Sequence, residues 1–322
     1  MAGTTTDGTP ERIRIRMGGY GPRTTSFSRA LERIGDSLQA RYGDRVEIRY
    51  VFNIMDLGYR ADDILWLVED GVLTLGYQSM SYLTGRIPEL GMLDLPFLFA
   101  TTASARAAMD ADLGQAIAAR IEARTGYRIL GFFENGLRHL SNRLRPVAAP
   151  GDLAGMRIRV LPSVVHQRTF ELLGAAPMQM DLTEAIAMIT GGELDAQENP
   201  LTNTVTYGVH GFHRFHTLTG HFYLSRPIFV HRNSFDAWPA DLQAAVREAV
   251  TAAVAAQRSA HDREEEDARA AIAAQGGEIA ALTAAGHAAF AAAVKPVWDE
   301  ARALYGDDLI ALAATGHRSD RA

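Results

Sequence analysis

Two arginines on one face of a short segment are the residues in this sequence best suited to bind an anion. In GMRIRVLP (155–162), apolar residues alternate with Arg157 and Arg159, which is the period of a half-buried strand that ends at a proline turn. A guanidinium is planar, keeps its charge at any physiological pH and can form two parallel hydrogen bonds to a carboxylate. The pattern therefore leaves two possibilities for this face, an anion site or a solvent-exposed surface.

Position has to decide between them, because arginine is abundant throughout the chain. Lys295 is the single lysine among 32 lysine and arginine residues, so arginine fills basic positions of every kind. Ligands of open α/β sheets bind in the crevice beyond the C-terminal ends of the strands. Arg159 is nearer that end of its strand than Arg157. Position therefore makes Arg159 the better candidate for an anion contact, although a solvent-exposed face stays open as the alternative, and Arg157 is expected to lie in solvent.

Two amide side chains lie at comparable strand ends in the two halves of the chain. GVLTLGYQ (71–78) and GELDAQEN (192–199) each follow a helical segment that ends in glycine, so Gln78 and Asn199 occupy similar places. This repetition suggests two similar lobes with a crevice between them. Asn199 precedes Pro200, so a simple turn is the alternative. At a strand end its amide can also donate to a carboxylate or a hydroxyl group.

A cluster of histidines raises the possibility of a metal site. His210, His213, His216 and His221 fall within twelve residues. Residues at i and i+3 share a face only on a regular helix, and Gly211 with its aromatic neighbours argues against one. No carboxylate is near in the sequence to complete a ligand set. We therefore expect these histidines to pack and hydrogen-bond in a loop rather than bind zinc.

A glycine-rich turn raises the possibility of a dinucleotide site. RIRIRMGGYGPRT (12–24) predicts a strand, a turn and the start of a helix, as in a pyrophosphate-binding loop. However, Thr24 occupies the third glycine position, and the second strand ends at Phe52–Asn53 where a ribose-binding acid is expected. No G-x-S-x-G, Walker or H-E-x-x-H motif is present. The sequence therefore predicts no catalytic site, no cofactor and no metal.

The candidate binding residues are positioned by strands that alternate with helices along the first two thirds of the chain. Strands are expected over 12–17, 46–52, 72–78, 127–133, 156–162, 176–180 and 194–199. Helices are expected over about 24–43, 61–71, 163–173 and 183–192. The segment ENGLRHLSNRLRPVAAPGDLAG (134–155) is rich in turn residues and predicts a connection. The alternation is typical of an α/β fold with a largely parallel sheet.

One long helix is expected in the last third of the chain. The run from about Ala240 to Gln275 follows Pro239 and contains neither glycine nor proline. At 1.5 Å per residue it would be roughly 50 Å long, enough to brace two lobes. The charged cluster DREEEDAR (262–269) is interpreted as its solvated face.

Bulk composition excludes several classes of protein. The chain has 322 residues, a net charge of −6 and no cysteine, so a basic nucleic-acid surface, disulfides and thiolate metal sites are not expected. No apolar run reaches the roughly 18 residues of a membrane helix. MAGTTTDGTPERIRIRM (1–17) lacks the apolar region of a secretory signal. We expect either a cytosolic protein or a signal removed before this sequence begins.

Several segments, taken in order, resemble one family of binding proteins. They are IPELGMLDLPFLF (87–99), RHLSNR (138–143), PGDLAGMRIRV (150–160), LGAAPMQMDLTEAIAMI (173–189), GELDAQENP (192–200) and TGHFYLSRPIFVHRNSFDAWPADLQ (219–243). As a linked set they resemble the solute-binding proteins of tripartite ATP-independent periplasmic (TRAP) transporters, of the C4-dicarboxylate-binding type. The resemblance extends from about residue 12 to residue 300.

The resemblance implies a fold and a set of ligand-binding residues. The fold is a two-lobed periplasmic binding protein, in which α/β lobes joined by crossing strands and a long helix close on the ligand. The arginine after DLAG corresponds to Arg159, and the arginine ahead of SNR corresponds to Arg138. Asn199 matches the asparagine of QENP, and Leu182 stands where some members place an aromatic ring. The first lobe is expected to contribute Ser26, Tyr77, Gln78 and Ser79.

The resemblance also implies a division into two lobes and a function. One lobe is expected to comprise residues 1–135 and about 225–264, and the other residues 136–224 and about 265–322. The protein is expected to capture a small organic carboxylate in the periplasm and deliver it to the membrane subunits of a TRAP-type transporter. Neither a nucleic acid partner nor a membrane-embedded segment is expected. The alternatives are a ligand-sensing module for a receptor and an NAD-dependent dehydrogenase.

Overall fold

The structure is a computed structural model that describes residues 12–315. The first eleven residues of the N-terminal segment 1–17 discussed above therefore lie outside the described residues. The strands are β1 (Ile13–Gly18), β2 (Val46–Val51), β3 (Leu75–Tyr77), β4 (Tyr127–Asn142), β5 (Arg157–Val160), β6 (Ala176–Gln179), β7 (Ala196–Asn199), β8 (Phe215–His231) and β9 (Glu278–Ala281). The helices are α1 (Ser26–Tyr42), α2 (Ile64–Glu69), α3 (Thr102–Asp110), α4 (Asp112–Arg124), α5 (Val164–Leu172), α6 (Leu182–Thr190), α7 (Leu201–Thr206), α8 (Arg232–Ala237), α9 (Ala240–Ala274), α10 (Ala284–Ala293), α11 (Lys295–Tyr305) and α12 (Asp308–Thr315).

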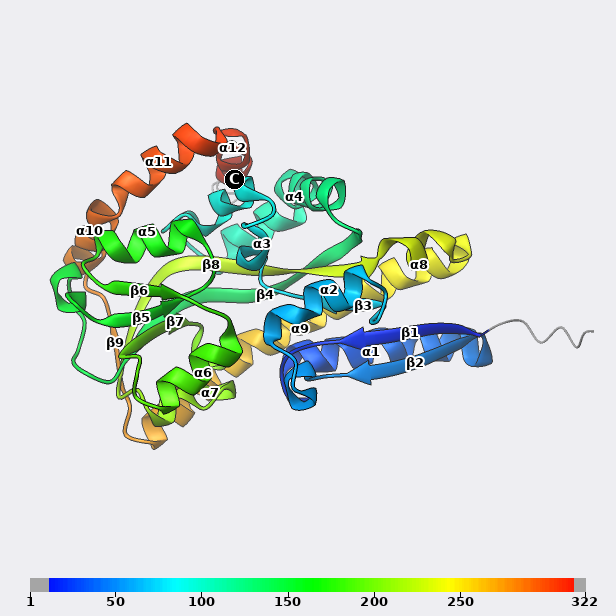
Figure 1. The fold of residues 1–322 in the computed structure, drawn as a ribbon, viewed down its shortest axis with the longest axis horizontal. Coiled ribbons are helices and arrows are strands. Elements are labelled where there is room, and N and C mark those ends of the chain that lie inside the picture. Colours follow the sequence, from blue (N-terminus) through cyan, green and yellow to red (C-terminus); the bar gives the residue numbers. More distant parts are fainter. Residues whose placement is uncertain (1–11, 316–322) are drawn as a thin grey trace, which may run out of the picture.

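All described strands form one mixed sheet in the order β2-β1-β3-β8-β4-β7-β5-β6, and β9 pairs with β8. The outer triplets β2-β1-β3 and β7-β5-β6 are parallel, as the βα alternation predicts, whereas β3, β8, β4 and β7 pair antiparallel. β4 and β8 have 16 and 17 residues, so each extends about 50 Å. They connect the two parallel triplets, which lie at opposite ends of the molecule (Figure 1).

The course of β4 shows that the prediction of a connection over residues 134–155 is wrong for residues 134–142 and holds for residues 143–155. The strand continues to Asn142 and pairs with both β7 and β8. A β-bulge interrupts its register between Glu134 and Gly136, where Gly136 has φ of +89°. A Cβ there would lie 2.5 Å from Nε2 of His261, so the position favours glycine on both counts. Residues that resemble a turn in the sequence therefore shape a bulge inside a strand.

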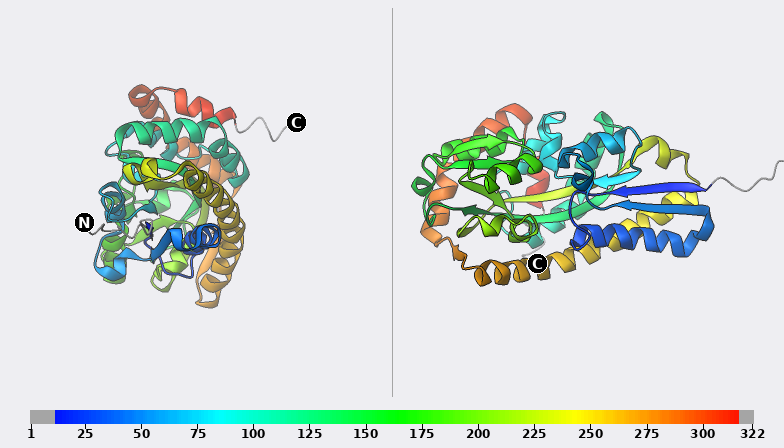
Figure 2. Two further views of the ribbon diagram at one scale, coloured as in Figure 1. Left: turned by 90° about the vertical axis from the view of Figure 1, so that its right-hand side faces the viewer. Right: turned by 60° about the horizontal axis from the view of Figure 1, so that its bottom comes forward.

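α9 is a single helix of 35 residues, which confirms the long helix predicted over 240–275. It runs along much of the molecule and packs against α1 and β4 (Figure 2). Gln257 of α9 donates from Nε2 to the carbonyl of Glu134 and accepts from the N–H of Glu134, both at 3.0 Å. This pair of hydrogen bonds fastens the helix to the bulge in β4.

The charged cluster of α9 (262–269) is mostly solvent-exposed, as interpreted from the sequence, but some of its members also contact other elements. Asp262 pairs with Arg106 of α3 at 2.6 Å. Glu265 accepts hydrogen bonds from the backbone N–H and the hydroxyl of Thr202 in α7, at 2.9 and 2.6 Å. The cluster therefore ties the long helix to elements that the sequence analysis assigns to different lobes.

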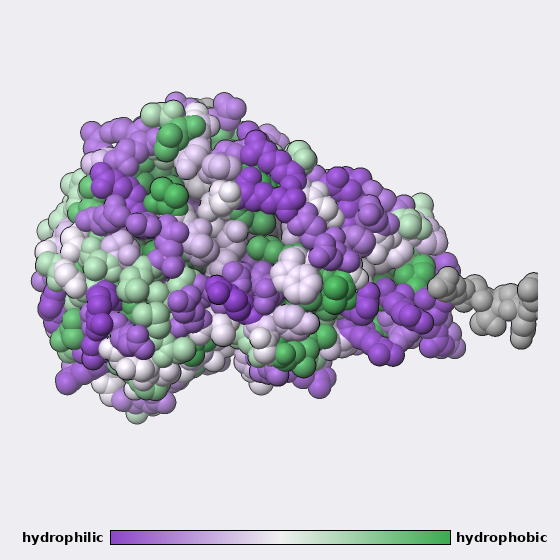
Figure 3. Space-filling view, viewed as in Figure 1, coloured by the Kyte–Doolittle hydropathy of each residue, from purple (hydrophilic) through white to green (hydrophobic). Residues whose placement is uncertain are grey.

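The C-terminal helices return along the molecule. α11 contacts α5, and α12 packs against α3 and α4. The contacts of α12 therefore cross the lobe boundary expected from the sequence, and the division into lobes stays a prediction. Among the described residues, no helix combines the length and the apolar character needed to cross a membrane. The face shown in Figure 3 is largely hydrophilic, with smaller apolar patches between the polar side chains.

Candidate functional site

A small polar cavity lies where the N-terminal segments meet the C-terminal ends of β5 and β7. Its open volume for water-sized molecules is about 20 Å³. The lining residues are Tyr20, Gln78, Ser79, Tyr82, Asn135, Arg138, Arg159, Leu161, Leu182, Asn199, Asn203, Tyr207 and Arg226. A second cavity of about 270 Å³ adjoins it and shares Asn203, Tyr207 and Arg226 as common walls. We call them the inner and outer cavities.

Arg159 reaches the inner cavity from β5, whose neighbours β6 and β7 lie on both sides. Only 2% of the residue is exposed. Its Nη2 donates to the phenol oxygen of Tyr82 at 3.0 Å, and Nε and Nη2 donate to the carbonyl of Met180 at 3.3 and 3.1 Å. No carboxylate within the described residues forms an ion pair with it. Arg157, by contrast, is exposed and pairs with Asp195 at 3.0 Å.

Asn199 lies at the end of β7 and belongs to a chain of buried amides. Its Nδ2 donates to Oε1 of Gln197 at 3.2 Å, and its Oδ1 accepts from Nδ2 of Asn203 at 3.2 Å. Nδ2 of Asn203 also donates to Oδ1 of Asn135 at 2.9 Å. The strand end thus joins directly to α7 through Pro200, rather than forming an isolated turn.

Arg138 lines the inner cavity, but its charge is already neutralised. Nε and Nη2 form an ion pair with the carboxylate of Glu198, and Nη2 also donates to the Glu198 carbonyl. Burial alone would raise the pKa of Glu198, yet Arg138 together with His166 and His221 holds that pKa well below its usual range. The main role of Arg138 is therefore structural, as the counter-ion of the buried Glu198 carboxylate.

Arg226 is the charged residue among the seven lining residues that the sequence analysis missed, the others being Tyr20, Tyr82, Asn135, Leu161, Asn203 and Tyr207. It comes from β8, is 4% exposed and donates from Nη2 to Oδ1 of Asn135 at 2.7 Å. Its guanidinium carbon lies 4.1 Å from the centre of the Phe27 ring and 5.1 Å from that of Tyr20. The signal available in the sequence was a single charge inside the otherwise apolar run FYLSRPIFV (222–230).

Six of the eight predicted ligand-binding residues line the inner cavity. They are Arg159, Asn199, Arg138, Leu182, Gln78 and Ser79. Within the described residues, the buried hydroxyl of Ser79 has no hydrogen-bond partner, so it is available to a ligand. Both polar atoms of Gln78 are engaged, because Nε2 donates to the carbonyl of Ala61 and Oε1 accepts from the N–H of Ser79.

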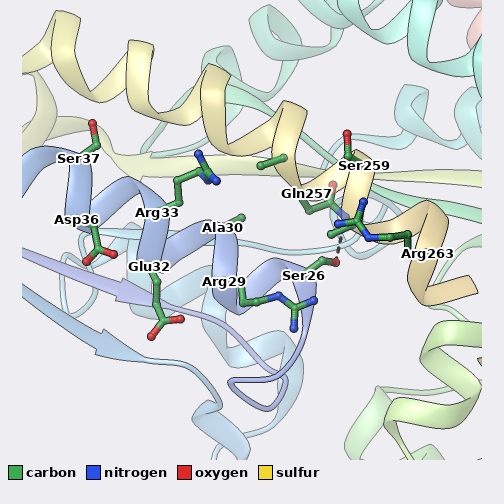
Figure 4. Close-up of a pocket in the computed structure, with 12 residues that line it drawn as sticks. Ser26, Arg29, Ala30, Glu32, Arg33, Asp36, Ser37, Gln257, Ser259 and Arg263 are labelled. Atoms are coloured by element: carbon green, nitrogen blue, oxygen red, sulfur yellow. Dashed lines mark hydrogen bonds between the residues drawn. The ribbon is translucent and has the colours of Figure 1, made fainter. Parts of the chain in front are cut away.

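The other two predicted residues lie outside the inner cavity. Tyr77 lines the outer cavity, where its ring stacks on Phe27. Ser26 lies in a polar groove between α1 and α9, and its hydroxyl accepts from Nε2 of Gln257 at 3.5 Å (Figure 4). The structure therefore does not bring Ser26 together with Arg159. Ser26 is fully buried against α9, where it helps join the two helices.

The tyrosines of the inner cavity are neutral hydrogen-bonding groups. Burial raises the pKa of Tyr82 to about 12 and the pKa values of Tyr20 and Tyr207 above the usual range, despite the nearby arginines. At physiological pH these phenols therefore keep their protons. They can donate to or accept from a ligand, but they do not neutralise Arg159 or Arg226.

The histidines near residue 215 lie partly on a strand, which corrects the expectation of a loop. His216 and His221 belong to β8, and His213 precedes it. Nδ1 of His213 hydrogen-bonds the hydroxyl of Ser141 at 2.9 Å, and Nε2 of His216 donates to the carbonyl of His213 at 3.0 Å. Within the described part of the chain, no three histidine, cysteine, aspartate or glutamate residues are grouped so as to hold a metal ion.

Because His213 and His216 are buried, we expect the protein to lose stability in mild acid. Burial lowers the pKa of His213 to about 3 and that of His216 to about 4. In the unfolded chain both titrate near 6.5, so the unfolded state binds protons first as the pH falls. Each should reduce the free energy of unfolding by about 2 kcal/mol between pH 7.5 and pH 5. Urea unfolding at these two pH values measures the loss, and His213→Asn should make it smaller; an unchanged loss would contradict the assignment.

Comparison with known proteins places the chain in a family. Residues 17–303 match the profile of the family described as "Bacterial extracellular solute-binding protein, family 7". A solute-binding protein of Verminephrobacter eiseniae is 30% identical over 268 residues, which cover 83% of this chain and 78% of that protein. The 2,3-diketo-L-gulonate-binding periplasmic protein of Escherichia coli is 28% identical over 232 residues, which cover 72% and 70% of the two chains.

The solved structures agree on the fold. A TRAP periplasmic solute binding protein from Shewanella oneidensis, with bound succinate, matches with a TM-score of 0.89 at 20% identity, over 95% of this chain and 99% of the other. This likeness confirms the predicted two-lobed α/β fold with its long helix. The family match confirms the resemblance to TRAP-transporter binding proteins that the motifs indicate. The chain therefore belongs to bacterial extracellular solute-binding protein family 7.

Proposed function

We propose that this protein captures a small organic acid and delivers it to a TRAP-type membrane transporter. The observation that carries the proposal is the buried guanidinium of Arg159, which lines a polar cavity and has no carboxylate partner among the described residues. A buried charge is costly unless an opposite charge accompanies it. A carboxylate in the cavity would supply that charge and accept hydrogen bonds in the planar arrangement that guanidinium favours.

The family supports the location, the partner and the absence of catalysis. The Escherichia coli relative is named as periplasmic and as binding 2,3-diketo-L-gulonate, and the Shewanella oneidensis structure holds succinate; both ligands are carboxylates. We accordingly place this protein outside the cytoplasm, in the periplasm, with a transporter's membrane subunits as its partner. We assign it binding and release of the acid, without chemical conversion.

Capture would proceed by closure of the two lobes about the central strands and α9. Several hydrogen bonds already join segments that the sequence analysis assigns to different lobes. Arg159 donates to Tyr82, the N–H of Ala61 donates to the hydroxyl of Thr183 at 3.2 Å, and Thr84 donates to a carbonyl of the second lobe at 3.1 Å. These contacts enclose the inner cavity, so that a bound acid would be removed from water and its attraction to Arg159 strengthened.

A panel of organic acids tests this function. We expect at least one dicarboxylate, sugar acid or keto acid to stabilise the protein against unfolding by about 2.7 kcal/mol when present at 100 times its Kd. Thermal unfolding followed by fluorescence screens the panel, and calorimetry gives the affinity. The primary amides of the same acids are matched controls, because they keep the shape and lose the charge. Stabilisation by the amides as strong as by the acids would contradict the proposal, as would NADH binding without acid binding.

A further inference from the structure

Two buried carboxylates are linked to the wall of the inner cavity, but only one of them has an arginine partner. Glu198 and Asp94 are 0% and 1% exposed. Glu198 forms an ion pair with the cavity-lining Arg138. Asp94 pairs with no arginine or lysine among the described residues, and its Oδ1 accepts a hydrogen bond from the hydroxyl of Ser81 at 2.8 Å. Without a further cation, this cluster would bury a net negative charge, which is costly.

His166 lies between the two carboxylates. Its Nε2 is 3.5 Å from Oδ1 of Asp94, and its Nδ1 is 3.7 Å from Oε1 of Glu198. The residue comes from the first turn of α5, is fully buried, and stacks its ring on that of Phe222 with 4.0 Å between the centroids. Each ring nitrogen therefore faces a carboxylate oxygen. An imidazolium has a proton on both nitrogens, whereas a neutral imidazole would turn a lone pair toward one of the carboxylates.

The other titratable groups around this cluster do not supply the missing positive charge. His221 of β8 lies 3.7 Å from Oε2 of Glu198, but burial lowers its pKa, so it is neutral at physiological pH. Tyr305 of α11 is close enough to feel the charge of Asp94, and burial raises the pKa of its phenol, so it keeps its proton. Burial by itself would lower the pKa of His166, but Asp94 and Glu198 raise it above its usual range.

We propose that His166 is a positioning residue for acid binding, an imidazolium that holds Glu198 and thereby fixes Arg138 at the inner cavity. The inference rests on the proposed capture of an organic acid and deepens it. With His166 charged, two cations balance the two carboxylates, and the cluster is neutral. With a neutral group in its place, the cluster has a net negative charge next to the cavity, which repels an incoming carboxylate.

The charge of His166 is measured directly in the full chain without ligand. NMR of protein labelled with ¹⁵N in its histidines reports the protonation of each ring nitrogen, and the signals of His166 are those that a variant without this histidine lacks. We expect both ring nitrogens of His166 to carry protons at pH 7.5, where a histidine of the unfolded chain is mostly neutral. A neutral ring at this pH would overturn the proposal.

Variants that change the charge balance test the effect on binding. His166→Gln should weaken calorimetric binding of the tightest-binding acid of the panel about tenfold, a typical strength of coupling between two sites. Adding Asp94→Asn removes the unmatched negative charge, so the double variant should return to within about threefold of the wild-type affinity. A role of the ring in packing alone would not be rescued, because Asp94→Asn restores no ring. His287→Gln, at an exposed histidine of α10, is the matched control and should leave the affinity unchanged.

The outcomes separate the two proposals. If His166→Gln binds the acid as tightly as the wild-type protein, the positioning role is overturned and the proposed function stands. The same holds if the double variant binds as weakly as His166→Gln. If the wild-type protein binds no acid of the panel, the proposed function fails, and the positioning role fails with it whatever the charge of His166. Should His166→Gln fail to fold, the double variant, which buries no unmatched charge, and the NMR measurement still decide.

Discussion

Arg159→Gln is expected to reduce the affinity for the bound acid by a factor of roughly 30 to 5000, which corresponds to the loss of about 2–5 kcal/mol for a buried charge pair. The reason is that the carboxylate would still be withdrawn from water but would meet an amide instead of a cation. Calorimetric titration with the acid identified in the panel measures the loss. Arg159→Ala should remove detectable binding.

The fold of this variant should survive, which separates a binding role from a structural one. Arg159 has no carboxylate partner among the described residues, so its removal leaves no unpaired negative charge inside the protein. We therefore expect the free energy of unfolding without ligand to stay within about 1 kcal/mol of the wild-type value or to rise. Arg157→Gln should leave the affinity unchanged. Wild-type affinity in Arg159→Gln would refute the site.

Glu198→Gln is expected to produce the largest loss of stability of any single substitution considered. Glu198 and Arg138 are 0% and 1% exposed at their side chains, and His166 and His221 lie 3.7 Å from the same carboxylate. Removing the negative charge leaves the Arg138 cation buried without a counter-ion. Breaking a buried pair in this way costs about 3–5 kcal/mol. Urea unfolding should show the loss, and the melting temperature should fall by roughly 10 °C.

Two further variants show whether the cost comes from the unpaired charge. Glu248→Gln removes an exposed ion pair with Arg41 and should cost less than about 1 kcal/mol. Replacing both members of the buried pair, Arg138→Met with Glu198→Leu, should recover much of the stability, because no charge is then buried alone. A loss below about 1 kcal/mol in Glu198→Gln would mean that the pair is not structural, and Arg138 would return as a primary ligand-binding residue.

The sequence predicted the elements that have strong local signals. The helix expected over about 24–43 is α1, which Thr25 caps and Gly43 ends, and Asp181 caps α6, because threonine and aspartate side chains favour this position. The alternation around Arg159 predicted the strand, but it left open whether the arginine face is buried, as the structure shows for Arg159. The same local reasoning was wrong for residues 134–142, where asparagine and glycine indicate a turn and the structure has a bulged strand. Pairing with β8 along the segment, and with β7 over His139–Asn142, holds it extended.

By itself, therefore, the sequence determined the α/β framework, the long helix and the placement of Arg159 at a strand end, because each depends on periodicity and capping within one segment. The tertiary structure alone decided which arginines have charge left for a ligand. Ion pairing joins residues that are distant in sequence: Arg138 meets Glu198 across 60 positions and is neutralised. Arg226, in an apolar strand that predicts only burial, lies among aromatic rings and amides and keeps its charge for the cavity.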